Sequence, residues 1–343
     1  MLKVSPGDAA IPRVSTSQLD QGGGRQQMRR LGRRQRIVAP IWTALVVCQW
    51  SNLALALQTQ SITYVLTRQT DPASTIVADA DGAWRATFTD GASTVLVHGP
   101  SRTFVESTTG ATVTTSNWVR ALPKPFAGAV DTDWLSTRLA DRSPDALAIA
   151  MQYATGAPTV YDGGGSKIGG DADYGPLQAD GTRQEGADFN DYLGVPWTYG
   201  STTDPPEVDQ AGALDCSGFL RMVWGYRLGL PLGLQPGGAA IPRRAHQIAS
   251  SAPGVVVVKD NGVVSTAYSK LATGDLVFFD AATDDGTQID HAGMYMGLDS
   301  GGRHRFISSR KTVNGPTIGD VGGRSLLDGT GLYAKSFRSA RRL

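Results

Sequence analysis

From residue 193 to the C-terminus the sequence predicts one helix followed by several short strands, and this order limits the possible folds more than any other feature. The helix should run from Cys216 to Gly229, because apolar residues recur there at spacings of three and four and Asp215 stands at an N-cap position. Strands are expected between Gly/Asp turns at Leu276–Phe279, His291–Met296, Arg305–Ser308 and Tyr333–Arg338. The pattern favours an α+β fold, with the helix packed on an antiparallel sheet.

Two further regions precede this domain. Residues 58–130 alternate β-branched and polar residues between turn signals such as Asp81-Gly82, with short strands expected at 94–97, 103–106 and 112–115. Residues 131–192 should form two short helices, capped at Asp133 and at Ser143-Pro144, and then a Gly/Asp-rich linker. The 42 glycines and 18 prolines also favour a loop-rich protein. We therefore expect a smaller β-rich accessory domain before residues 193–343.

The first 57 residues have the order of a basic leader and a signal-like segment. Six arginines lie between residues 25 and 36, and an apolar run from Ile37 to Leu57 follows. Small residues at Ala54 and Ala56 suit cleavage near Ala56. Polar residues in the second half of the run make it a poor membrane span. The sequence therefore predicts a secreted protein, which would contact the membrane only through this segment if it is not cleaved.

Charge and cysteine content narrow the function classes. The 32 Lys and Arg balance 31 Asp and Glu, so the net charge is +1 and nucleic acid is not an expected partner. Of the two cysteines, Cys48 lies in the segment expected to be removed, which leaves Cys216 as a buried small hydrophobe or a reactive thiol. The carboxylates between residues 156 and 194 lack the ligand spacing of a calcium loop, so no metal site is expected.

Cys216 stands where a nucleophile could be activated. At the first turn of a helix, free backbone N–H groups and the dipole stabilise a thiolate, and they can also hold the oxyanion formed on attack. The sequence contains four histidines as candidate bases: His98, His246, His291 and His304. His291 is preferred because it opens an apolar strand with small neighbours, where a rigid backbone can hold an imidazole against a helix.

Four sequence motifs resemble those of the NlpC family of papain-like cell-wall cysteine peptidases, and they follow one another along the chain in the family's order. Asp215-Cys216-Ser217-Gly218-Phe219 is similar to the nucleophile motif, residues 271–279 (LATGDLVFF) to the L-x-x-G-D-L-V-F-F strand, and residues 291–297 (HAGMYMG) to the H-x-G-x-Y-x-G strand. Ile241-Pro242-Arg243 resembles the short L-P-R segment between them. The resemblance covers residues 193–343 and does not extend to residues 1–160.

The resemblance implies hydrolysis of peptidoglycan stem peptides without a metal or organic cofactor. Cys216 would be the nucleophile and His291 the base, while Asp215 and Ser217 would bind the free amino end of the substrate. The third catalytic position, usually His, falls on Ser308, which can accept a hydrogen bond but carries no charge. The family's P-Y-x-W-G segment corresponds here to residues 196–200 (PWTYG). Trp197 and Tyr199 are expected either to line the substrate site or to pack in the core.

Two other functions remain open at this point. Serine at the third position suggests a catalytically silent cell-wall binding module. The same thiol chemistry also suits an amidase or an acyl transferase that acts on another amide. Release of peptides from isolated peptidoglycan separates the first alternative from a peptidase, and mass analysis of the products separates the second.

Overall fold

The computed structural model describes residues 63–282 and 285–343. The signal-like segment predicted for residues 1–57 and Cys48 lie outside this range. Among the described residues, no helix combines the length and the apolar character that a membrane crossing requires.

The N-terminal part of the described chain is an antiparallel sheet of five strands in sequential order. The strands are β1 (Tyr64–Thr70), β2 (Ala73–Asp79), β3 (Trp84–Thr89), β4 (Thr94–Val105) and β5 (Thr112–Ala121). The strands expected at 94–97 and 103–106 are one long strand, in which the pairing with β5 is irregular between His98 and Arg102. The alternating pattern buries one face of the sheet, where Val77, Phe88 and Val95 pack with Leu135. The expected β-rich region is therefore present.

Two short helices follow, and both begin at a different cap from the one expected. Helix α1 (Thr132–Ala140) is capped by Asp131, which accepts a hydrogen bond from the Trp134 backbone, and α2 (Ala146–Met151) is capped by Asp145. The expected caps, Asp133 and Ser143-Pro144, were wrong because an aspartate two residues away has the extended backbone that an N-cap needs. The strands β6 (Val160–Tyr161) and β7 (Lys167–Gly169) then form a small ribbon.

The second sheet has six antiparallel strands in the order β10-β15-β11-β12-β13-β14. Their bounds are β10 (Val255–Val258), β15 (Phe337–Arg342), β11 (Leu276–Phe279), β12 (His291–Leu298), β13 (His304–Arg310) and β14 (Gly315–Thr317). The predicted strands at 276–279, 291–296 and 305–308 are confirmed. The strand predicted at 333–338 was partly wrong, because helix α6 (Leu332–Ser336) precedes β15.

Helices cover one face of this sheet and carry the candidate nucleophile. Helix α4 (Cys216–Arg221) continues as a π-helical turn, η2 (Met222–Arg227), so the helix predicted at 216–229 is confirmed over most of its length. Phe219 and Leu220 pack with Met294 and Ile307 from β12 and β13 in the largest core cluster. The remaining elements are α3 (Phe189–Leu193), β8 (Trp197–Tyr199), β9 (Thr202–Asp204), α5 (Ala245–Ser251) and the 3-10 turns η1 (Val208–Gln210) and η3 (Tyr268–Lys270).

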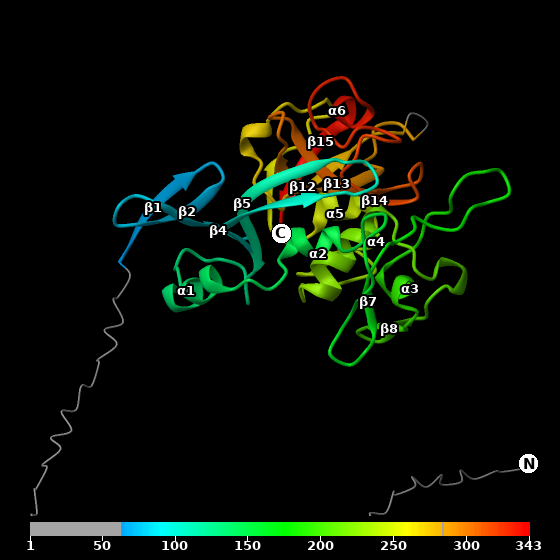
Figure 1. The fold of residues 1–343 in the computed structure, drawn as a ribbon, viewed down its shortest axis with the longest axis horizontal. Coiled ribbons are helices and arrows are strands. Elements are labelled where there is room, and N and C mark those ends of the chain that lie inside the picture. The colour runs from blue at the N-terminus through cyan, green and yellow to red at the C-terminus, as the bar shows by residue number, and fades with distance from the viewer. Residues whose placement is uncertain (1–62, 283–284) are drawn as a thin grey trace, which may run out of the picture. The chain divides into compact units, whose positions relative to one another are not determined.

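The two sheets belong to one compact unit. The C-terminal carbonyl of Leu343 accepts a hydrogen bond from Thr94 of β4 at 2.7 Å, and Asn117 of β5 donates to Thr273 at 3.1 Å. The β4–β5 hairpin extends beside β12 and β13 (Figure 1). Contacts therefore cross the expected boundaries near residues 130 and 192, and the division into domains at these boundaries stays a prediction.

Candidate active site

Cys216 is the first residue of α4, and its position depends on the residues around it. Asp215 is the N-cap and accepts hydrogen bonds from the Gly218 backbone at 2.7 Å and the Ser217 hydroxyl at 3.0 Å. Gly218 lies so close to the chain before α3 that a Cβ would come within 2.2 Å of the Ala187 carbonyl oxygen. Only glycine allows this approach, which places the first turn of the helix at the wall of the site.

Arg243 forms hydrogen bonds with the polar side chains beside the thiol. Its guanidinium donates to Asp215 at 2.8 Å and to the Ser217 hydroxyl at 2.7 Å. Burial alone would raise the pKa of Asp215, but Arg243, the Gly218 N–H and Ser217 outweigh burial and hold that pKa below its ordinary value. Asp215 is therefore an ionised carboxylate that is fully engaged within the protein.

The thiol opens into a cavity of about 570 Å³. Asp215, Ser217, Arg243 and His246 also line it, whereas His291 lines a second cavity of about 240 Å³. Five residues contribute to the walls of both cavities: Tyr174, Glu185, Ala282, Asp290 and Lys311. The two cavities thus adjoin, and the candidate nucleophile and base face neighbouring parts of one cleft.

His291 begins β12 and is held by an aromatic ring. Tyr333 of α6 stacks on the imidazole with the ring centroids 5.0 Å apart and the planes 29° from parallel. The Nε2 atom is buried and has no hydrogen-bond partner among the residues that the structure describes. Burial is the main cause of a His291 pKa lowered to about 3; Arg310 and Lys311 act in the same direction, and Asp215 opposes them. The resting imidazole is therefore neutral.

The thiol is also neutral at rest. The Cys216 residue is only 7% exposed, and burial raises the thiol pKa well above its ordinary value. Asp215 and Glu185 raise it further, whereas the Ala292 N–H and Arg243 act in the opposite direction. Because Nε2 of His291 makes no hydrogen bond within the described range, it does not bind the free, buried Cys216 thiol in this state. The thiolate expected at the helix start is not the resting state, because burial and two carboxylates outweigh the helix dipole.

A neutral pair predicts a particular pH dependence of thiol alkylation. In the full chain carrying Cys48→Ser, the rate of Cys216 alkylation by iodoacetamide should keep rising above pH 8.5, because the folded thiol pKa lies above its unfolded value of about 8.5. A preformed ion pair would instead react at a constant, high rate from about pH 5 upward. Mass spectrometry of quenched samples measures the rate, and the same protein in urea supplies the unperturbed reference.

The other predicted site residues occupy different places. Ser308 lies on β13 beside Gly293, and its buried hydroxyl has no partner among the described residues. Trp197 packs edge-on against Phe189, and the Tyr199 hydroxyl accepts a hydrogen bond from the buried Arg221 at 2.6 Å. Neither Trp197 nor Tyr199 lines the cavities of the thiol or of the histidine in the described chain. The structure therefore brings Asp215, Ser217 and Cys216 together, but not these two aromatic residues.

Several residues at the cleft were not singled out by the sequence as site residues. Tyr174 and Glu185 come from the Gly/Asp-rich region, and Lys311 and Arg310 follow Ser308 at the end of β13. Lys311 and Glu185 form an exposed ion pair of 2.7 Å along the shared wall. For Arg243, the motif Ile241-Pro242-Arg243 could have indicated a role at the site. The other residues named here lie in parts of the sequence that have neither periodicity nor a motif.

Comparison with known proteins agrees with this geometry. Residues 194–330 match the model of the NlpC/P60 family. The chain contains an NlpC/P60 domain. This domain holds Cys216, His291 and Ser308, whereas the five-stranded sheet lies before it.

One solved structure with some similarity is described as similar to a lipoprotein of the NLP/P60 family, from Staphylococcus aureus subsp. aureus Mu50. It is 16% identical, with 61% of this chain and 47% of that chain covered and a TM-score of 0.26. The match thus spans about half of that protein's length. No curated protein gives a significant match.

Proposed function

We propose that the chain is a secreted cysteine peptidase that hydrolyses amide bonds in peptidoglycan stem peptides, with Cys216 as nucleophile and His291 as general base. One observation carries the proposal: the Cys216 thiol stands at the start of a helix and opens into a cavity that adjoins the cavity of His291. An NlpC/P60 domain points to a cell-wall peptidase-type function, and a thiol is a suitable nucleophile for an amide carbonyl.

The proposed reaction begins from the neutral pair. A substrate bound along the shared wall would exclude water while the Cys216 sulfur attacks the amide carbonyl and His291 accepts the thiol proton. The N–H groups of the first turn of α4 would stabilise the oxyanion. The imidazolium then donates its proton to the leaving amine, which leaves a thioester on Cys216. Water, deprotonated by His291, hydrolyses the thioester and regenerates the thiol.

In the resting protein, Asp215 and Ser217 interact with a neighbouring side chain. They were expected to bind the free amino end of the substrate, but both interact with Arg243. An ammonium group could reach the carboxylate only by displacing Arg243 or by sharing its oxygens. In the resting protein, these two residues hold the start of α4, and amine binding by them stays a prediction.

The unpartnered hydroxyl of Ser308 favours the second candidate, a catalytically silent wall-binding module. No hydrogen bond from Ser308 orients the His291 ring in the described residues. A free imidazole would spend less time in the geometry that accepts the thiol proton, which would slow the reaction. The rate, rather than the architecture of the site, therefore separates the two candidates.

Isolated peptidoglycan incubated with the purified protein tests the proposal. We expect new amino groups and soluble peptides to appear, with masses that correspond to addition of one water across an amide bond. The Cys216→Ala variant, which lacks the sulfur but keeps the helix cap, should release neither. Products joined to an added amine would instead identify an acyl transferase. Binding to peptidoglycan without release of amines by the intact protein would favour the silent module.

A further inference from the structure

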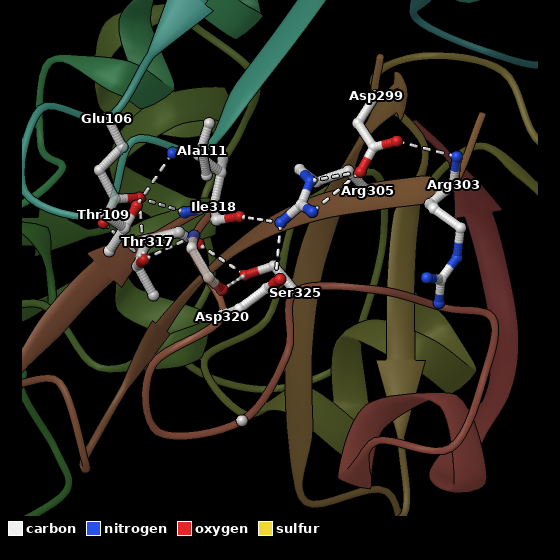
Figure 2. Close-up of polar contacts among 12 residues, drawn as sticks. Glu106, Thr109, Ala111, Asp299, Arg303, Arg305, Thr317, Ile318, Asp320 and Ser325 are labelled. Carbon is white, nitrogen blue, oxygen red and sulfur yellow. Dashed lines mark hydrogen bonds and ion pairs between the residues drawn. The ribbon is translucent and has the colours of Figure 1, made fainter. Parts of the chain in front are cut away.

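The β4–β5 hairpin reaches into the NlpC/P60 domain through one buried carboxylate. Glu106, at the hairpin, is 2% exposed and accepts hydrogen bonds from the Thr317 hydroxyl at 2.8 Å and the Ile318 backbone at 2.6 Å (Figure 2). Thr109 from the same hairpin lies against Gly319, where a Cβ would come within 2.5 Å of its methyl group. The hairpin therefore fixes the position of residues 317–319.

Two of these residues, Thr317 and Gly319, also bind the buried Arg310, whereas the Ile318 carbonyl accepts a hydrogen bond from Arg305. Arg310 donates to the carbonyl oxygens of Gly319 at 3.2 Å and Thr317 at 3.5 Å, and also to the Ser325 hydroxyl and the Gly323 carbonyl. The Thr317 hydroxyl, which binds Glu106, also accepts the Gly319 N–H at 2.8 Å. Glu106 and Arg310 thus hold opposite sides of one short segment.

Arg310 in turn stands beside the proposed base. Its guanidinium carbon lies 5.2 Å from the centre of the Tyr333 ring, and that ring stacks on His291. Arg310, Tyr333 and His291 line the same cavity of about 240 Å³. Among the described residues, no carboxylate forms an ion pair with Arg310. The charges of Glu106 and Asp320 attract this buried cation only from a distance.

We infer that Glu106 is a positioning residue for the proposed catalytic base: through residues 317–319 it holds Arg310 beside His291. The β-rich region therefore contributes to the proposed active site. This inference rests on the proposed function for its catalytic meaning, but not for its geometry.

The physical effect would be to keep the imidazole unprotonated. A fixed guanidinium opposes a second positive charge close by, so His291 stays neutral at acidic as well as neutral pH. The other ionisable groups that line the His291 cavity are Tyr174, Glu185, Asp290, Lys311 and Tyr333, and the charge of Asp215 also acts on the ring. Loss of Glu106 should leave these in place and release only residues 317–319 with Arg310.

The test is a ¹³C NMR titration of imidazole-labelled full-length protein, with the His291 signal assigned from the His291→Gln variant. Over a titration from about pH 8 to about pH 2.5, the wild-type His291 midpoint should lie near the acid end, at about 3. Glu106→Gln and Arg310→Gln should each raise the midpoint by about one pH unit or more, the size expected when one close charge moves. The double variant should match Arg310→Gln alone, since both act through one arginine.

Asp145→Asn is the matched control. Asp145 is also a buried carboxylate that ties the N-terminal sheet to a helix, through Arg102 and the Val119 backbone, but it does not contact residues 317–319. It should lower the melting temperature without moving the His291 midpoint. If Glu106→Gln fails to fold, Thr317→Val removes the hydroxyl that joins Glu106 to the segment and should shift the midpoint in the same direction.

An unchanged His291 midpoint in Glu106→Gln, or shifts that add in the double variant, would overturn the inference. For the active protein, the acidic limb of the kcat/KM profile should move to higher pH in Glu106→Gln, because His291 would be protonated at a higher pH, whereas Asp145→Asn should leave the profile unchanged. If wild type releases nothing from peptidoglycan, the proposed function fails, but the NMR midpoints still decide whether Glu106 positions Arg310.

Discussion

Replacing His291 with glutamine should lower kcat/KM for stem-peptide hydrolysis about 10²–10⁴-fold, the usual contribution of a general base. Glutamine keeps a polar side chain of similar size beside Tyr333 but cannot accept the thiol proton. The loss should appear in kcat, because proton transfer to the imidazole occurs in the transition state. Release of amino groups from a purified stem peptide over a range of concentrations measures both constants.

His246→Gln is the decisive comparison. His246 lines the cavity that contains the thiol, whereas His291 lines the adjoining one, so position alone leaves His246 as a rival base. His246 is partly exposed on α5, and among the described residues no aromatic ring stacks on it as Tyr333 stacks on His291. We expect the His246→Gln rate to stay near wild type. The opposite result, with His246→Gln inactive and His291→Gln active, would transfer the role of base to His246.

Residues 193–343 produced alone should fail to fold cooperatively, although they include the whole of the NlpC/P60 match. The largest core cluster contains Val113 and Val119 from β5 and Leu147 and Tyr153 from the α2 region, packed with Phe219 and its neighbours on α4. Each large apolar side chain removed from a core costs about 2–5 kcal/mol, and a domain has only about 5–15 kcal/mol of stability. The loss of several such residues exceeds the total.

Thermal unfolding followed by circular dichroism measures this directly. A chain of residues 60–343 should show one cooperative transition, because it retains the hydrogen bond from Thr94 to the Leu343 carbonyl and the shared core. The 193–343 fragment should show none and should expose apolar surface. A cooperative transition in the fragment would mean that the β-rich region is dispensable for folding, as the sequence alone suggested.

Local sequence patterns were sufficient for the elements that carry the chemistry. Asp215 followed by Cys216 and an apolar spacing of three and four predicted the start of α4, because capping and helix periodicity depend on neighbouring residues. The strand that begins at His291 was predicted from its apolar run for the same reason. Where two local signals competed, tertiary packing decided: Tyr333 has strand-like neighbours, yet its ring packs from α6 against His291.

Only the tertiary structure decided the electrostatic state of the site. The sequence predicted a thiolate at a helix start, but burial, Asp215 and Glu185 raise the thiol pKa and the pair rests neutral. Glu106 and Arg310 are more than 200 residues apart, and no sequence pattern indicates that they lie close together. In the fold, both form hydrogen bonds with residues 317–319. The candidate nucleophile and base were chosen from short-range sequence patterns, but their charge depends on groups brought close by long-range packing, and burial strengthens every such interaction.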